Sequence, residues 1–384
     1  MRLYEYEGKE IFKKIGIPVP QGILARTKEE VWQAATRIGK EVVLKSQILA
    51  GGRGKAGGIK IAVTPQDAEK LSQGILGTEL RGYKVDSLLV EEKLNIADEI
   101  YAGITVDHKK GMPVAMVCEE GGVEIEDFTA RNPERIAYRA IDPLHGMREY
   151  DAINLVRHIR LTEKTLVSVS RIVTQLYSVF TASDARVAEI NPLVITDDGK
   201  AIAGDARIEV DDNSIFRHPQ LGDLRDQRIQ NQWEREAAKA GVSYVELDGD
   251  IAVMATGAGL TMTLLDLTKD EGGSPASFLD TGGGLSKERM KNAVGLLLRV
   301  SKANPKIKVI LVMARMMMSP PDEVAKGILE AIREEKAEAP VVAVMRGRKE
   351  YEKRAHELLK DSEVRLYSDI RAGVREAVRI AGRK

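Results

Sequence analysis

A glycine-rich stretch of the chain, KSQILAGGRGKAGGIK at residues 45–60, has the composition of a loop that binds an anion. Five glycines and three basic residues lie between positions 51 and 60, and glycine lets backbone N–H groups approach an anion because no Cβ intervenes. Lys45, Arg53 and Lys55 would add charge for phosphate oxygens. The stretch lacks the GxxxxGK[ST] order of a P-loop, and a strand rather than a helix is expected to follow it. We therefore predict a phosphate-binding hairpin, with a basic surface hairpin as the alternative.

Two groups of acidic and amide side chains could complete such a site. Glu91 and Glu92 end a predicted strand, and Glu99 lies beyond them. Asn191, within Glu-Ile-Asn-Pro, and Asp205 lie at the ends of strands that a hairpin joins, so the two can converge. A carboxylate and a carboxamide oxygen suit Mg²⁺, which keeps several waters and shares phosphate oxygens. The alternatives are a solvated strand end for the glutamates and a simple turn at Asn-Pro.

The elements that would position these residues are mixed along the first half of the chain, which is typical of an α+β domain. Amphipathic or capped patterns predict helices at 5–14, 27–38, 65–74 and 161–180. Apolar β-forming runs predict strands on both sides of the glycine-rich stretch and at 22–26, 87–92, 99–106, 113–118, 185–190, 193–196 and 201–205.

The second half of the chain has a more regular pattern. Strands predicted at 251–255, 277–279, 308–313, 341–345 and 364–366 each precede a helical segment. Five such units predict a doubly wound parallel sheet with helices on both faces, in which ligands bind beyond the carboxyl ends of the strands. A polar segment at 211–250 separates the halves, and we place the domain boundary between residues 236 and 237, giving domains 1–236 and 237–384.

The overall composition excludes several classes of protein. The 384 residues carry 58 basic and 58 acidic side chains, and this balance argues against a nucleic-acid binder. No apolar run approaches the length of a membrane span, and the N-terminus lacks the apolar core of a signal peptide. The single cysteine, Cys118, cannot form an internal disulfide. We expect a soluble, cytoplasmic protein with no nucleic-acid and no membrane partner.

Several motifs together resemble the β subunit of succinate–CoA ligase, from Leu3 to the C-terminus. They are the opening Leu-x-Glu-Tyr-x-x-Lys, SQILAGGRGKAGGIK, LVEE, EEGGVEIE, EINPLVITDDG, SIFRHP, TGAGLTM and FLDTGGG. The resemblance implies an ATP-grasp domain followed by a flavodoxin-like CoA-ligase domain. It also implies a reaction of ATP, a carboxylic acid and CoA that yields acyl-CoA, ADP and phosphate. A partner α subunit would hold CoA and carry the phosphoryl group on a histidine, in a heterodimer or heterotetramer.

The resemblance assigns roles to residues already singled out. Lys45, Gly52, Arg53 and Gly54 match nucleotide-phosphate contacts, and Glu91, Leu94 and Glu99 match positions on the adenine–ribose side. Asn191 and Asp205 match Mg²⁺ ligands, Glu189 matches the glutamate that meets the histidine loop of α, and Pro20 matches a proline of ATP-type members. None of the chain's own histidines lies in a metal-ligand or triad pattern: His108, His145, His158, His218 and His356. This fits a phosphohistidine that the partner supplies.

One stretch departs from the family pattern, on the side of the acid substrate. The family's Asn-Ile-Phe-Gly-Gly-Ile-x-Arg is replaced by residues 313–322, MARMMMSPPD, and its Asn-Gly-Ala-Gly begins here with Thr256. We expect Ser319 to cap a helix with Pro320 at its first position, and Arg315 either to bind a carboxylate or to be a solvated charge. The substrate-side candidates are Thr256, Arg315, Met317, Met318 and Ser319.

The acid itself is left open by this departure. Succinate is the default, and citrate, malate or another acid is the alternative. A non-catalytic ATP-binding paralogue and a stand-alone ATP-grasp ligase are the competing interpretations, and the second is disfavoured because the C-terminal domain would have no role without a partner.

Overall fold

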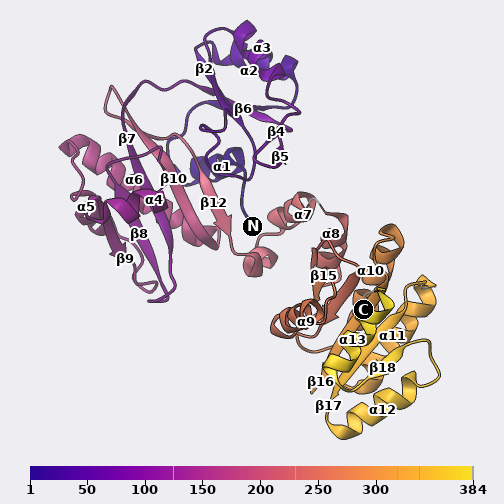
Figure 1. Cartoon of the computed structure of the whole chain (residues 1–384). Coiled ribbons are helices and arrows are strands. Elements are labelled where there is room, and N and C mark those ends of the chain that lie inside the picture. Colours follow the sequence, from indigo (N-terminus) through magenta and orange to yellow (C-terminus); the bar gives the residue numbers. More distant parts are fainter. Residues whose placement is uncertain (124, 230, 318, 337, 383–384) are drawn as a thin grey trace. The chain divides into compact units, whose positions relative to one another are not determined.

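The computed structural model describes residues 1–123, 125–229, 231–317, 319–336 and 338–382, which form two compact units (Figure 1). The first unit is Met1–Gly222 and the second is Asp223–Lys384. The division lies inside α7 (Pro219–Arg228), whereas the expected boundary at 236/237 falls inside α8 (Gln232–Lys239). Helix α8 contacts β13 (Ser243–Glu246), so it belongs with the second unit.

A small antiparallel sheet carries the glycine-rich stretch in the first unit. Its strand order is β1 (Gly22–Ala25), β6 (Leu88–Glu92), β2 (Val42–Ser46) and β3 (Ile59–Ala62). Helices α2 (Lys28–Ile38) and α3 (Pro65–Gln73) cover one face, where Val42 and Leu44 are buried. Because side chains alternate along a strand, Val43 and Lys45 point to the opposite face. A short two-stranded sheet, β4 (Glu79–Leu80) with β5 (Tyr83–Lys84), lies in the segment between α3 and β6.

A larger antiparallel sheet forms the rest of the first unit. Its order is β11 (Ala201–Ala203), β10 (Ala185–Thr196), β7 (Ile96–Asp107), β8 (Met112–Cys118) and β9 (Ile136–Ala140), and β12 (Arg207–Val210) also pairs with β10. Its helices and helical turns are α1 (Glu5–Ile15), α4 (Ile125–Arg131), η1 (Pro133–Arg135), α5 (Glu149–Val156), α6 (Glu163–Ala182) and η2 (Asp212–Arg217). Helix α1 contacts both α6 and β12, which places its buried face beside the residues that follow β11.

The second unit is a six-stranded sheet between two helical layers. Its order is β13, β15 (Pro275–Asp280), β14 (Ile251–Ala255), β16 (Val309–Met316), β17 (Val341–Gly347) and β18 (Arg365–Tyr367). One face packs on α9 (Ala258–Asp270) and α13 (Ile370–Ile380). The other face packs on α8, α10 (Lys287–Ala303), α11 (Pro321–Glu335) and α12 (Lys349–Leu359). The five predicted strands are all present and parallel, as a doubly wound fold requires.

Several predicted elements have different limits in the structure. The strands expected at 185–190 and 193–196 are one strand, β10, whose register against β7 shifts between Ile190 and Leu193. Strand β13, antiparallel at the edge of the second sheet, was not expected. Strand β16 continues to Met316, so Arg315 and Met316 belong to the sheet rather than to the loop after it. Within the described part of the chain, no helix is both long and apolar enough to cross a membrane.

Candidate functional site

A cavity of about 450 Å³ in the first unit gathers the residues predicted for the nucleotide, the metal and phosphoryl transfer. It opens on the face of the small sheet opposite α2 and α3, and residues from β7, β10 and the segment after β11 complete its wall. The predicted residues that line it are Pro20, Lys45, Gly52, Arg53, Gly54, Lys55, Glu91, Glu92, Leu94, Glu99, Glu189, Asn191 and Asp205. Residues far apart in the sequence are thus brought to one site.

The glycine-rich loop between β2 and β3 is held as a compact turn. The amide of Ser46 donates to the carbonyl of Gly58 at 2.9 Å, and the amide of Gly58 donates to the carbonyl of Arg53 at 2.8 Å. A Cβ on Gly58 would lie 2.5 Å from Cδ2 of Leu80, so a larger residue at this position would force the Leu80 side chain to move. Gly52 has a φ of 66°, a conformation that glycine adopts without strain. The turn directs the Arg53 side chain inward, where Nη1 donates to the Ser46 carbonyl at 3.1 Å.

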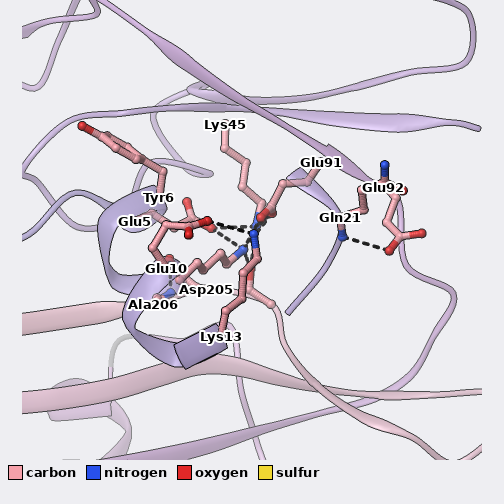
Figure 2. A network of polar contacts seen from close by, with 12 residues as sticks. Glu5, Tyr6, Glu10, Lys13, Gln21, Lys45, Glu91, Glu92, Asp205 and Ala206 are labelled. Atoms are coloured by element: carbon pink, nitrogen blue, oxygen red, sulfur yellow. Dashed lines mark hydrogen bonds and ion pairs between the residues drawn. The ribbon is translucent and has the colours of Figure 1, made fainter. Parts of the chain in front are cut away.

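Six charged side chains form ion pairs with one another at or directly behind the cavity wall, and we call them the charge cluster: Glu5, Lys9, Lys45, Arg53, Glu91 and Asp205. Figure 2 shows Glu5 of α1, Lys45 of β2 and Glu91 of β6 converging from three elements. Lys45 Nζ lies 2.9 Å from Glu5 Oε1 and 2.8 Å from Glu91 Oε2. Arg53 contacts Glu5 Oε2 at 2.7 Å and Asp205 Oδ1 at 2.9 Å. Three cations therefore face three carboxylates.

Opposite charges outweigh burial in setting the ionisation of this cluster. Burial alone would raise the pKa of Glu5, but the neighbouring cations, Lys45 foremost, hold that pKa well below its ordinary value. Burial alone would lower the pKa of Lys45, but Glu5, Glu91 and Asp205 raise it above the ordinary value. The pKa of Arg53 is raised for the same reason, by Glu5 and Asp205 against burial. All three groups are therefore charged at neutral pH.

Of the two predicted metal ligands, Asn191 lies where the register of β10 against β7 shifts, and Asp205 follows β11. Asn191 Oδ1 accepts from the Gly122 amide at 2.7 Å, and its Nδ2 donates to the Val123 carbonyl at 2.9 Å. These two bonds fix the orientation of the amide and leave Oδ1 a second lone pair. Asp205 lies on the cavity wall. Its Oδ1 accepts one hydrogen bond from the Arg53 guanidinium and one from the Ala206 amide.

The glutamates predicted for nucleotide contact and phosphoryl transfer have distinct environments. Glu91 is 2% exposed, and Lys9 and Lys45 bind its two oxygens. Glu99 is half-buried next to Gly122, where a Cβ would lie 2.9 Å from Glu99 Oε2. Glu189 is buried on β10 and lies 3.4 Å from Arg207 Nη1 on β12. Glu91 is thus held by two lysines on the wall of the cavity.

Glu5 and Lys9 are the functional candidates that the sequence interpretation missed. Both lie on α1, four residues apart and therefore on one helix face, and both are 3% exposed. The signal was available in the opening Leu-x-Glu-Tyr-x-x-Lys, where charged residues occupy a helix face that an amphipathic pattern would make apolar. Two charges buried on one face indicate partners elsewhere in the chain, because unpaired buried charges are strongly unfavourable.

In the second unit, Asp280 joins the two glycine-containing loops that follow β14 and β15. Its Oδ1 accepts from the Gly257 amide at 2.8 Å and from the Gly282 amide at 2.7 Å. Both glycines have positive φ, 104° and 66°, and a Cβ on either would meet no atom of the structure within 4 Å. These loops are the Thr-Gly-Ala-Gly and Thr-Gly-Gly-Gly segments that the sequence placed at strand ends.

The substrate-side candidates share this edge of the sheet but differ in exposure. Thr256 Oγ1 accepts from the Arg315 amide at 3.0 Å, and the Arg315 side chain is exposed at the end of β16. Ser319 is buried, and its Oγ accepts from the Leu285 amide at 2.8 Å. The expectation that Ser319 caps a helix was wrong, because Pro320 is the N-cap of α11 and Ser319 is bonded elsewhere. Met317 is half exposed, and Met318 lies outside the described residues.

Two family models match the chain. The model described as the ATP-grasp domain matches residues 2–195, and the model described as CoA-ligase matches residues 254–380. The predicted order of the two domains is thereby confirmed.

Relatives along the whole length carry one enzyme name. The β subunit of a GDP-forming succinate–CoA ligase from Thermus thermophilus is 42% identical over 96% of this chain and 95% of its own length. The β subunit of an ADP-forming succinate–CoA ligase from Ignicoccus hospitalis is 41% identical over 99% of both chains. A similar ADP-forming subunit from Halorubrum lacusprofundi is 39% identical, again over 99% of both.

Solved structures share the fold at lower identity. ATP citrate lyase from Methanothrix soehngenii, in complex with citrate and coenzyme A, superposes with a TM-score of 0.78 at 17% identity. The match covers 98% of this chain and 99% of that one. ATP citrate lyase from Methanosaeta concilii gives a TM-score of 0.73 at 16% identity, over 95% of this chain and 94% of that one. The predicted fold class is confirmed by this likeness together with the family models.

Proposed function

This chain belongs to the succinate–CoA ligase β-subunit family, and we propose on that premise that it binds the nucleotide for an acid–CoA ligase that forms ADP. The proposed reaction takes ATP, a carboxylic acid and CoA to acyl-CoA, ADP and phosphate. Succinate is the first candidate acid because the full-length relatives are named for it. The observation that carries the proposal is that Lys45, Arg53, Asn191 and Asp205 line one cavity.

Lys45 and Arg53 are the proposed ligands of the nucleotide phosphates. Both are charged donors on the cavity wall, and the backbone amides of Gly52 and Gly54 lie beside Arg53 in the same loop. Phosphate oxygens would replace some of the carboxylate oxygens that these cations now contact. Leu94 and Glu99 remain the proposed contacts on the adenine–ribose side. For Glu91 we propose a role in holding Lys45, since both of its oxygens are already bound to lysines.

Asn191 and Asp205 would hold Mg²⁺ together with phosphate and water oxygens. The donor set fits, because Mg²⁺ is commonly bound through one or two protein oxygens and otherwise by water and phosphate. Among the described residues, no three acidic, histidine or cysteine side chains converge in a way that could hold a metal by themselves. Bound there, the ion would neutralise phosphate charge. The chain's own part would be to present the Asn191 oxygen, fixed by Gly122 and Val123, next to the Asp205 carboxylate.

A partner α subunit is the proposed carrier of the phosphohistidine and of the CoA site. No described histidine of this chain lines the cavity. His218 is bound to Asp184 at 2.9 Å, and His145 to Asp142 at 2.9 Å. Glu189, buried on the cavity wall, is the proposed contact to the partner's histidine loop. The proposed assembly is a heterodimer or heterotetramer.

The proposed compartment is the cytoplasm. The single thiol, Cys118, is buried, and burial raises its pKa, so it is protected from oxidation.

The acid would bind at the carboxyl edge of the second sheet. Thr256, Arg315, Met317, Met318 and Ser319 are the proposed contacts. Arg315 is the cationic candidate among them, and among the described residues its guanidinium has no carboxylate partner. Succinate is proposed first, with citrate and malate as the alternatives that an extra cation would favour.

An assay of the reconstituted α and β subunits against a panel of acids tests the proposal. We expect one acid, succinate first, to support ATP- and CoA-dependent formation of a thioester. The Asp205→Ala complex is the control for background hydrolysis. Tight MgATP binding without thioester formation for any acid would instead identify a non-catalytic nucleotide-binding protein.

A further inference from the structure

Two lysines of the charge cluster, Lys9 and Lys45, contact the same acceptor groups, which are two carboxylates and one backbone carbonyl. Lys45 Nζ lies 2.9 Å from Glu5 Oε1 and 2.8 Å from Glu91 Oε2, and it donates to the Gly204 carbonyl at 2.5 Å. Lys9 Nζ lies 2.8 Å from Glu5 Oε1 and 2.6 Å from Glu91 Oε1, and it donates to the same carbonyl at 2.9 Å. The two ammonium groups therefore share the same three partner residues.

Only one of the two lysines faces the cavity. The Lys45 side chain is 13% exposed and lines the cavity, whereas that of Lys9 is 4% exposed and is not among the lining residues. An ammonium group has three N–H donors, and Lys45 already has three acceptors. A phosphate oxygen would be a fourth acceptor for Lys45, so it would compete with the oxygens of Glu5, Glu91 and Gly204.

We propose that Lys9 is a positioning residue for nucleotide binding, which keeps Glu5 and Glu91 paired when Lys45 turns to a phosphate. This inference rests on the proposed function. A buried carboxylate that loses its cation is strongly destabilised, and that penalty would otherwise oppose the movement of Lys45. Lys9 removes the penalty because it already holds both carboxylates, and its place behind Lys45 keeps it from competing for the ligand.

The test compares MgATP binding by full-length wild-type chain and by the Lys9→Gln variant, measured by titration calorimetry. Without Lys9, Glu91 depends on Lys45 alone and Glu5 on Lys45 and Arg53, and we expect ATP to bind about tenfold or more weakly. In the reconstituted enzyme the KM for ATP should rise by a similar factor while kcat changes less. Lys13→Gln is the matched control, since Lys13 lies on the same helix but its ion pair with Glu10 is exposed.

The double variant Lys9→Gln/Glu91→Gln separates a charge role from a purely structural one. It removes one cation and one carboxylate, so the charges of the cluster balance again. We expect its ATP affinity to exceed that of Lys9→Gln, because Glu91 no longer needs a cation, but to stay below that of wild type, because Lys45 has lost Glu91. A purely structural role would make the second substitution worse than the first. If Lys9→Gln does not fold, the double variant is compared with Glu91→Gln: the two should bind ATP about equally, and a clearly weaker double variant would contradict the inference.

Two results would overturn the inference alone: unchanged ATP affinity in Lys9→Gln, or no recovery in the double variant. Absence of ATP binding by the wild-type chain would overturn the proposed function as well.

Discussion

Replacing Glu5 by Gln should destabilise the first unit more than any surface substitution on α1. Glu5 contacts three cations, with Lys9 Nζ at 2.8 Å, Lys45 Nζ at 2.9 Å and Arg53 Nη1 at 2.7 Å. Its side chain is 1% exposed, so water cannot replace it. Gln keeps the shape but leaves three buried cations with two carboxylates. Removing one partner of a buried ion pair typically costs about 3–5 kcal/mol, and we expect a loss of that size in the free energy of unfolding.

Urea unfolding followed by tryptophan fluorescence can isolate the first unit. The chain has two tryptophans, Trp32 on α2 and Trp233 on α8, one in each unit. A Trp233→Phe background therefore leaves Trp32 to report on the first unit alone. Glu10→Gln is the control, because its exposed pair with Lys13 should contribute no more than about 1 kcal/mol. A loss below about 1 kcal/mol in Glu5→Gln would refute the role assigned to this carboxylate.

The effect of Glu5 should also depend on pH in a defined direction. The folded-state pKa of Glu5 lies well below the ordinary value of 4.5, so the unfolded chain binds a proton first as the pH falls. Its stabilising contribution is complete above pH 4.5 and is lost as the pH falls toward the folded-state pKa. The difference in unfolding free energy between wild type and Glu5→Gln should therefore shrink below pH 4.5. A difference that stays constant there would contradict the depressed pKa.

Three further outcomes are expected. Asp205→Ala should weaken ATP binding in Mg²⁺ far more than in EDTA, because the lost carboxylate acts through the metal, and calorimetry showing equal losses would count against that role. Label from the γ-phosphate of ATP should appear, acid-labile, on a histidine of the partner subunit, and its appearance on this chain alone would contradict the division of labour. Arg315→Met should raise the KM for the acid about ten- to a hundredfold and leave the KM for ATP nearly unchanged. An unchanged acid KM would make Arg315 a solvated charge.

The sequence predicted those parts of the fold in which local pattern and tertiary packing agree. Thr27 and Thr64 cap α2 and α3 as their side chains suggested, with the Glu30 and Asp67 amides as donors. The apolar run at residues 42–44 correctly predicted a strand, and the structure buries Val42 and Leu44 on one of its faces. The glycine-rich hairpin was predicted from its composition, and in the structure Gly52 and Gly57 adopt positive φ whereas Gly58 lies close to neighbouring atoms.

The features that escaped prediction depend on contacts distant in sequence. Proline cannot donate to a strand ladder, so Asn191-Pro192 suggested a break, but the shifted register against β7 lets β10 continue. Ser319 was predicted to cap a helix, but its hydroxyl instead accepts a hydrogen bond from the amide of Leu285, which is 34 residues away in the sequence. The pattern of Glu5 and Lys9 on one helix face indicated that they have partners but not which ones, because Glu91 lies on β6, 82 residues from Lys9 in the sequence.

The hydrogen bonds from Asp280 to Gly257 and Gly282 have a consequence for how this edge of the second sheet can change. One oxygen of the Asp280 carboxylate fixes the start of both loops. The two glycines are therefore already ordered before a ligand binds, and binding does not have to restrict their backbone further. The conformations of the two loops are therefore coupled through Asp280. Because both donors are backbone amides, a loop grafted at residues 256–259 keeps its bond to Asp280 only if it holds the amide of residue 257 in place, so redesign toward another acid should treat residues 256–259 and 281–284 together.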